Sequence, residues 1–227
     1  MSLRAIVFDF DGVIANSEPL HFQGFRDVLA EEGIALTEPD YYARYLGFDD
    51  VGAFQAIAKH QGVAWTHAQL SAMVARKAVR LEALERNRSV LFPGAADAVR
   101  RAAAAMPIAI ASGARGDEIR RVLKRENLLA CFAAIVAAED TPAGKPSPDP
   151  YLRALALLAS SVGDRLKAED CVAIEDSRWG LESARAAGLR TVAVTSSYEA
   201  DELSADLTIA SLQAMDLDRL FLLCSSS

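Results

Sequence analysis

The sequence lacks an apolar run of about 18 residues, the length that a membrane-spanning helix needs. No signal-peptide core precedes the acidic residues at positions 9 and 11, so we expect no membrane partner. A disulfide framework is missing too, because the three cysteines, Cys131, Cys171 and Cys224, are odd in number, widely spaced and set in apolar runs. These features predict a cytoplasmic protein whose cysteines are reduced and lie in the core.

The chain also lacks an excess of basic residues. Its 227 residues contain 31 Asp and Glu against 24 Lys and Arg, which gives a formal net charge of -7 at pH 7. A negative surface does not attract nucleic acid, and we expect a monomer that binds a small molecule or a metal. The hydrophobic content of 52% is sufficient for one large core or two smaller ones.

What the sequence does contain is an apolar run after Arg4, residues 5–8, that leads directly into Asp9 and Asp11. Such a run is typical of a strand buried on both faces of a parallel sheet. In extended backbone Asp9 and Asp11 should project together, while Phe10 turns away and leaves its carbonyl oxygen free for a ligand. The two carboxylates would repel each other, and a hard cation such as Mg²⁺ would relieve the repulsion. The alternative is a strand that ends at a solvated acidic turn.

Helical periodicity covers residues 17–89, where we expect helices over 19–32, 38–45, 51–60 and 67–86. From residue 90 onward strands and helices alternate, with strands expected over 107–111, 133–137, 171–174, 191–194 and 207–210. Regular alternation predicts βαβ units. The expected fold is therefore α/β: a doubly wound parallel sheet built from residues 1–16 and 90–227, with a helical subdomain of residues 17–89 inserted after the first strand.

Ligands of open parallel sheets bind beyond the carboxyl ends of the strands, so the residues that follow each strand are informative. Ser112 and Gly113 follow the second strand and can hold a phosphate oxygen, unless Ser112 is a helix N-cap. Lys145 lies in a proline-bounded loop ahead of a helix that we expect Ser147 to cap, unless this lysine is an ordinary exposed one.

Glu175 and Asp176 directly follow the fourth core strand. Acids in this place need a counter-charge, which a metal shared with Asp9 would supply. The alternative is that Asp176 is the N-cap of the next helix. Each signal is modest alone, but all of them fall at one edge of the predicted sheet.

Together these segments resemble the four ordered motifs of the haloacid dehalogenase-like hydrolase superfamily, and the helical insert resembles the cap of its phosphatase and β-phosphoglucomutase branch. The matching segments are Asp9-Phe10-Asp11-Gly12-Val13, Ser112-Gly113, Lys145-Pro146-Ser147-Pro148 and Glu175-Asp176-Ser177. The resemblance implies that Asp9 is the nucleophile and Asp11 the general acid and base. It also implies that Ser112, Gly113 and Lys145 hold the phosphoryl group.

For the metal, the resemblance implies Mg²⁺ held by Asp9, Asp11, Glu175 and Asp176, with Asp11 contributing its backbone oxygen. His21 and Lys77 in the insert resemble residues with which the β-phosphoglucomutase branch aligns the second aspartate and the sugar phosphate. A plain packing role for His21 stays open.

The expected activity is magnesium-dependent hydrolysis of a small phosphorylated metabolite, such as a sugar phosphate, through an aspartyl-phosphate. One alternative is a phosphomutase, which needs a second phosphate site; the acidic loop 46–50 would repel that phosphate. The other is a binding module without catalysis.

Overall fold

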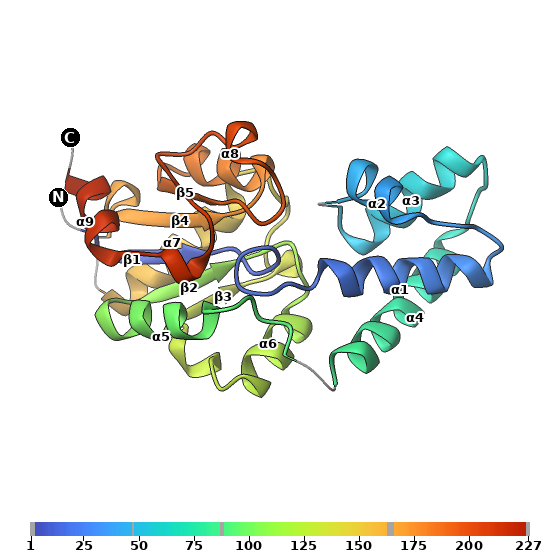
Figure 1. Cartoon of the computed structure of the whole chain (residues 1–227), viewed down its shortest axis with the longest axis horizontal. Helices are drawn as coiled ribbons and strands as arrows, with labels where there is room; N and C mark the ends of the chain where they lie inside the picture. The colour runs from blue at the N-terminus through green and yellow to red at the C-terminus, as the bar shows by residue number, and fades with distance from the viewer. Residues whose placement is uncertain (1–2, 47, 87–88, 163–165, 226–227) are drawn as a thin grey trace. The chain divides into compact units, whose positions relative to one another are not determined.

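The computed structural model describes residues 3–46, 48–86, 89–162 and 166–225. The chain divides into two compact units, one of residues 1–16 with 91–227 and one of residues 17–90. The first unit carries the sheet, and the second contributes the four helices α1 to α4 (Figure 1).

The sheet of the first unit is parallel throughout, with strand order β3-β2-β1-β4-β5-β6. Its strands are β1 (Ala5–Phe8), β2 (Ile108–Ala111), β3 (Ala134–Val136), β4 (Cys171–Glu175), β5 (Arg190–Val194) and β6 (Leu207–Ile209). Every residue of β1, β2 and β4 is buried, as expected for apolar runs covered on both faces. The predicted α/β fold with a doubly wound parallel sheet is confirmed.

Helices lie on both sides of this sheet (Figure 1). They are α5 (Ala95–Ala105), α6 (Gly116–Arg125), α7 (Asp149–Val162), α8 (Arg178–Ala186) and α9 (Leu217–Ser225). On one face, small strand residues such as Ala109 and Ala173 pack with Tyr151 and Leu158 of α7 and Ala184 of α8. Alanines on the strands let the helix backbones approach closely, so the large ring of Tyr151 is completely buried under the sheet.

The strand order reverses beside β1, because β2 pairs with one side of β1 and β4 with the other. In the paired register Phe8 lies opposite both Ile110 and Ile174, so the three strands end at the same level. The backbone N–H of Asp9 continues this pairing and donates to the carbonyl of Ile174 at 2.9 Å. A reversal of this kind leaves a crevice at the carboxyl ends of the strands, where ligands of such sheets bind.

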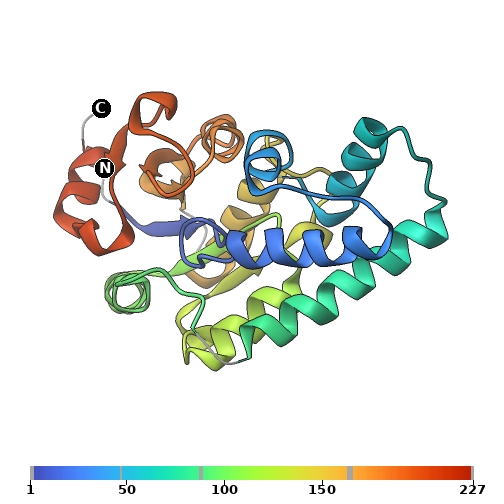
Figure 2. The ribbon, with the colours of Figure 1, turned by 45° about the vertical axis from the view of Figure 1, so that its right-hand side comes forward.

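The second unit consists of α1 (Glu18–Glu31), α2 (Glu38–Arg44), α3 (Asp50–Gln61) and α4 (His67–Glu85). Helices α1 and α4 run side by side (Figures 1 and 2). Their shared core contains Phe25, Leu29 and Met73, together with Phe54 of α3. The caps agree with the residue types: Thr66 forms a capping box with Gln69 at the start of α4, and Asp49 accepts the N–H of Gly52 at the start of α3.

The three cysteines are free thiols. Cys171 and Cys224 are buried as predicted, but Cys131 is only partly buried, because it ends a short 3-10 turn, Leu129–Cys131, at the surface. None of the helices in the described part of the chain has the length and apolar character that crossing a membrane requires.

Candidate active site

The backbone turns sharply as soon as β1 ends. Asp9 is buried, with an exposed fraction of 8%. The carbonyl of Phe10, which we expected to be free for a ligand, accepts the N–H groups of Ile14 at 2.9 Å and Ala15 at 2.8 Å. That expectation is therefore wrong. The chain uses this carbonyl to close the turn that places the acidic residues at the sheet edge.

Three buried carboxylates meet at the ends of β1 and β4. Asp9, Glu175 and Asp176 each offer an oxygen atom, and these atoms lie within 4.8 Å of one another. Asp11 is not part of this trio; its carboxylate has an oxygen within 4.8 Å of a carboxylate oxygen of Glu118, at the start of α6. Of the four predicted metal ligands, the fold thus brings the side chains of Asp9, Glu175 and Asp176 together, while the Asp11 side chain lies in different surroundings.

Lys145 supplies a positive charge to the trio. Its Nζ lies 2.9 Å from Oδ1 of Asp9 and donates a hydrogen bond to Oε1 of Glu175. Only 12% of its side chain is exposed, so the alternative of an ordinary surface lysine is wrong. Burial lowers the pKa of the Lys145 ammonium, but the charges of Asp9 and Glu175 outweigh it, and the net pKa is raised. The residue is therefore a permanent cation.

One ammonium does not balance three carboxylates. Burial, followed by the charge of Glu175, raises the pKa of Asp9 to about 6, although Lys145 acts in the opposite direction. Burial and the charges of Asp9 and Glu175 raise the pKa of Asp176 well above its ordinary range. Both shifts express the cost of keeping like charges close together out of water.

Asp176 is held by a residue that the sequence reasoning missed. The N-cap of α8 is Ser177, whose side chain accepts the N–H of Gly180 at 3.0 Å, so the alternative of Asp176 as the cap is wrong. Oδ2 of Asp176 instead accepts a hydrogen bond from the hydroxyl of Ser197. The adjacent Ser196 donates to the carbonyl of Gly12. The loop after β5 thereby ties both acidic segments together.

Ser196 and Ser197 could have been found from the sequence, because they follow a strand end just as the other site residues do. Tyr151 could not. Its hydroxyl donates to Oε1 of Glu175 at 2.7 Å from the first turn of α7. In the sequence it is one more large residue on a helix face that packs on the sheet, and nothing in that pattern distinguishes a tyrosine with a partner from an ordinary core residue.

Two glycines permit the close approach of backbone and carboxylates. Gly12 has φ +75°, and a Cβ atom built on it would lie 1.9 Å from Oδ2 of Asp176. At Gly180 a Cβ atom would lie 1.9 Å from the carboxyl carbon of Glu175. No side chain fits at either position, so both glycines are required by the site.

Ser112 and Gly113 follow β2 at the same edge of the sheet. The N–H of Ser112 donates to the carbonyl of Val136 at 3.0 Å, and its Oγ accepts the N–H of Ala114 at 3.1 Å. Helix α6 begins only at Gly116, so Ser112 is not its N-cap. Ser112 is buried and Gly113 exposed. The contacts to Val136 and Ala114 leave the hydroxyl proton of Ser112 available to a ligand.

The loop that carries Lys145 differs slightly from expectation. Helix α7 begins at Asp149, and the carbonyl of Pro148 accepts the N–H of Leu152, so Pro148 and not Ser147 is at the N-cap position. Oγ of Ser147 accepts only a long hydrogen bond, 3.4 Å, from the N–H of Asp149.

The residues present fit a hard divalent cation. Asp9, Glu175 and Asp176 offer only oxygen ligands, which suit magnesium. Oδ1 of Asp9 is buried and lies 2.9 Å from the ammonium of Lys145, its ion-pair partner. A cation at this place would add positive charge beside the three carboxylates and lower the cost of the clustered charges. Asp9 and Asp176 are therefore suited to hold it, with Glu175 alongside.

The two insert residues singled out in the sequence, His21 and Lys77, lie together in the helical unit. Nζ of Lys77 lies 2.8 Å from Nδ1 of His21, forms an ion pair with Asp50 and lies 4.2 Å from the ring centre of Phe25. The Lys77 side chain is completely buried. The acidic character of loop 46–50 thus has structural causes: Asp49 caps α3 and Asp50 neutralises Lys77. Gly47 of this loop lies outside the described residues.

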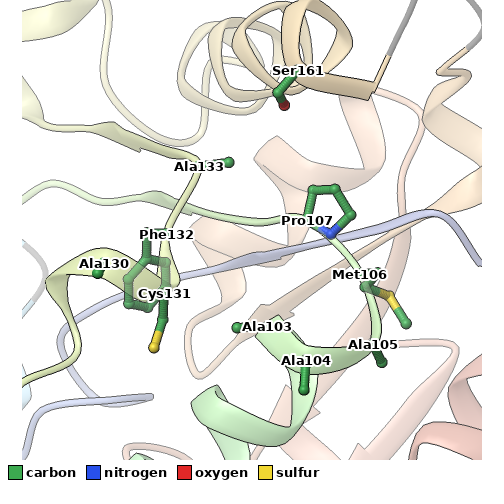
Figure 3. A pocket seen from close by; sticks show the side chains of 10 residues that line it. All are labelled: Ala103, Ala104, Ala105, Met106, Pro107, Ala130, Cys131, Phe132, Ala133 and Ser161. Carbon is green, nitrogen blue, oxygen red and sulfur yellow. The ribbon is translucent and has the colours of Figure 1, made fainter.

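A surface hollow of about 410 Å³ lies in the first unit, away from this site. It is lined by Ala103, Ala104, Ala105, Met106, Pro107, Ala130, Cys131, Phe132, Ala133 and Ser161 (Figure 3). All of these residues except Ser161, which lies near the end of α7, precede β2 or β3 in the chain, and the lining includes no charged side chain. It lacks the chemistry to bind a phosphoryl group.

With this geometry in place, comparison with known proteins identifies the class of hydrolase. Residues 3–188 match the family model described as hydrolase, haloacid dehalogenase-like hydrolase. Protein CbbY of Rhodobacter capsulatus is 34% identical over 232 residues, which cover 95% of this chain and 98% of that protein. Fructose-1-phosphate phosphatase YqaB of Escherichia coli K12 is 29% identical and matches over 83% of this chain and 95% of its own length.

A solved structure gives the same result. A mutant CbbY of Rhodobacter sphaeroides, in complex with xylulose-(1,5)-bisphosphate, superposes with a TM-score of 0.81 and 26% identity over 94% of this chain and 96% of that one. The chain belongs to the haloacid dehalogenase-like hydrolase family. It is an enzyme that hydrolyses phosphate esters.

The close approach at Gly180 gives a stability prediction. Exchange of a helical glycine for alanine ordinarily stabilises a helix by about 1 kcal/mol. At Gly180 we expect Gly180→Ala to destabilise the protein by about 2–3 kcal/mol, because the new methyl group overlaps the Glu175 carboxylate. Urea denaturation measures the change. Gly144→Ala is the control, since a Cβ atom there meets nothing within 4 Å, and equal stabilities for both variants would contradict the prediction.

The raised pKa of Asp9 gives a pH prediction for the metal-free protein. The folded state binds the Asp9 proton more tightly than the unfolded state, whose value is near 3.8, so the destabilisation appears as pH rises from about 4 to 6. The pKa of about 6 already includes the opposing attraction of Lys145, so at ~1.4 kcal/mol per pKa unit we expect Asp9→Asn to be about 2–3 kcal/mol more stable than wild type at pH 7.5.

Chelator-treated protein, melted at pH 4 and pH 7.5, provides the measurement. The stability difference between Asp9→Asn and wild type should shrink at pH 4, where Asp9 is protonated in the folded state and about half protonated in the unfolded state. A difference that is the same at both pH values would show that the carboxylate charge is not its cause.

Proposed function

We propose that this protein is a magnesium-dependent phosphomonoesterase that acts on a small phosphorylated sugar through an aspartyl-phosphate on Asp9. The observation that carries the proposal is the meeting of Asp9, Lys145 and Asp176, from three distant segments, at the carboxyl edge of the sheet. The names of relatives support the substrate class: one is a fructose-1-phosphate phosphatase, and another was solved with xylulose-(1,5)-bisphosphate.

In the first step, a carboxylate oxygen of Asp9 attacks phosphorus as the bond to the ester oxygen breaks. Asp11 donates a proton to the leaving oxygen, and the sugar departs as an alcohol. In the second step, Asp11 takes a proton from water, whose oxygen attacks phosphorus. The bond between Asp9 and phosphorus breaks, and inorganic phosphate leaves. Asp9 and Asp11 end in their starting states.

Most of the rate of such transfers comes from charge stabilisation and positioning. Lys145 is suited to neutralise the phosphoryl oxygens, because its ammonium is fixed beside Asp9. The Ser112 hydroxyl and the Gly113 N–H can donate to the same oxygens. A magnesium ion, when bound by Asp9, Asp176 and Glu175 with the Asp11 carbonyl, would supply further positive charge at the transferring group.

The substrate preference is proposed to lie in the helical unit, with Lys77 and His21. Lysines are rarely buried without a role or a partner, and Lys77 is held by Asp50 and His21 in a defined place. Because Asp50 compensates the charge of Lys77, this cluster carries little net charge for a second phosphate. That balance favours a monophosphate ester and hydrolysis over a phosphomutase reaction.

The proposal also covers the location and the oligomeric state of the enzyme. Free thiols at Cys131, Cys171 and Cys224 suit a reducing compartment, which supports the cytoplasm as the location. We propose that the enzyme acts as a monomer, and gel filtration tests this directly.

A substrate panel tests the function. We expect phosphate release from at least one sugar monophosphate with magnesium, and less than one hundredth of that rate with chelator. Asp9→Asn should abolish turnover and keep a cooperative melting transition, because only the nucleophile is lost. Release of a sugar isomer without phosphate would instead establish a phosphomutase, and an active Asp9→Asn variant would refute the nucleophile.

A second prediction concerns Lys77. Lys77→Ala should lower kcat/KM for the preferred sugar phosphate about tenfold or more, while turnover of a small aryl phosphate changes less than twofold. The reason is that the aryl phosphate needs only the residues of the sheet edge. Lys59→Ala, an exposed lysine on α3, is the matched control. Equal losses on both substrates would remove Lys77 from the specificity role.

A further inference from the structure

Tyr151 is a buried polar residue of the site to which the proposed reaction assigns no role. It lies in the first turn of α7 with no exposed surface. Its hydroxyl donates to Oε1 of Glu175 at 2.7 Å, and the centre of its ring lies 5.3 Å from Nζ of Lys145. The side chain thus touches both the carboxylate and the ammonium that flank Asp9. A phenylalanine would pack equally well but leave Glu175 without this donor.

Glu175 receives donors on both of its oxygens. Oε1 accepts from the Tyr151 hydroxyl and from Nζ of Lys145. Oε2 accepts from the Ser177 hydroxyl at 3.1 Å and from the N–H of Asp176 at 3.3 Å. These donors hold the fully buried carboxylate in a fixed position. The Glu175 carboxylate can therefore hold the groups that donate to it, including the Lys145 ammonium, in defined positions.

Tyr151 and Lys145 donate hydrogen bonds to the same atom, Oε1 of Glu175. A second donor on Oε1 weakens the pull of that oxygen on the ammonium. Lys145 is then free to divide its charge between Glu175, Asp9 and a phosphoryl group near Asp9.

We propose that Tyr151 is a positioning residue for phosphoryl transfer, whose hydroxyl holds Glu175 and thereby sets the place of the Lys145 ammonium beside Asp9. This inference rests on the proposed function, because it gives Lys145 the role of phosphoryl binder. Without the hydroxyl, Glu175 would draw Lys145 toward itself and away from the transferring group. The aromatic face of Tyr151 contributes by packing against the same ammonium.

The test is Tyr151→Phe, which keeps the ring and removes the hydroxyl. With a small aryl phosphate and magnesium, we expect kcat/KM to fall about tenfold and the inhibition constant of orthovanadate, a mimic of the transferring phosphoryl group, to rise by a similar factor. The dissociation constant of Mn²⁺, titrated by electron paramagnetic resonance, should change less than twofold, because the oxygens of Asp9 and Asp176 are untouched and Oε2 of Glu175 keeps its two donors.

Coupling to Lys145 is measured by a double-mutant cycle. In a Lys145→Ala background, Tyr151→Phe should cost less than a further twofold in kcat/KM, because the ammonium that it positions is gone. Tyr45→Phe is the matched control, since it also removes a buried hydroxyl, one that lies 2.8 Å from Nδ1 of His60 in the helical unit. It should leave aryl phosphate turnover and vanadate inhibition unchanged.

Three results would overturn the role of Tyr151: wild-type kinetics for Tyr151→Phe, an equal loss with and without Lys145, or a Mn²⁺ affinity changed more than fivefold, which would place the effect on the metal ligands. Each of these requires an active wild-type enzyme. A wild-type protein that releases no phosphate from any ester would instead refute the proposed function, so the two failures are distinguishable. Melting temperatures of Tyr151→Phe and Tyr45→Phe should agree within a few degrees, which excludes unfolding as the cause.

Discussion

The repulsion between Asp9, Glu175 and Asp176 is the constraint on which the rest of the site depends. Three buried carboxylates share one ammonium, that of Lys145, and the imbalance raises the pKa of Asp9 and Asp176. A fold driven by stability alone would not collect these charges out of water. The fold tolerates the free-energy cost of burying these carboxylates because the pairing of β1 with β2 and β4 fixes the sheet edge on which the carboxylates lie.

Around this imbalance, neutral donors keep each carboxylate in place. Tyr151 and Ser177 hold Glu175, and Ser197 holds Asp176. Neutral groups do this without cancelling negative charge, so the trio keeps its attraction for a cation. A second lysine would bind the carboxylates more strongly but would compete with a metal. This division explains why one charged and several uncharged donors surround the site.

In the helical unit, the buried charge is balanced by a charge of opposite sign. Lys77 is completely buried, and its charge is compensated within the same unit by Asp50. The pair is therefore close to neutral, while the sheet edge is strongly charged. This contrast agrees with a proposed division of roles, in which the residues of the sheet edge bind the phosphoryl group and the helical unit distinguishes the remainder of the substrate.

The sequence by itself determined the alternation of strands and helices, the parallel sheet, and the location of Asp9, Ser112, Lys145, Glu175 and Asp176 after strand ends, because the hydrophobic period and chain order are local properties. It did not determine the partners of those residues. The sequence suggests a free Phe10 carbonyl, which instead closes a turn. The hydroxyls of Tyr151 and Ser197 donate to Glu175 and Asp176, which lie 24 and 21 residues away in the chain. Only tertiary structure decided the contacts of Tyr151 and Ser197, because hydrogen bonds between distant segments depend on where packing places each helix and loop, and no local pattern records that.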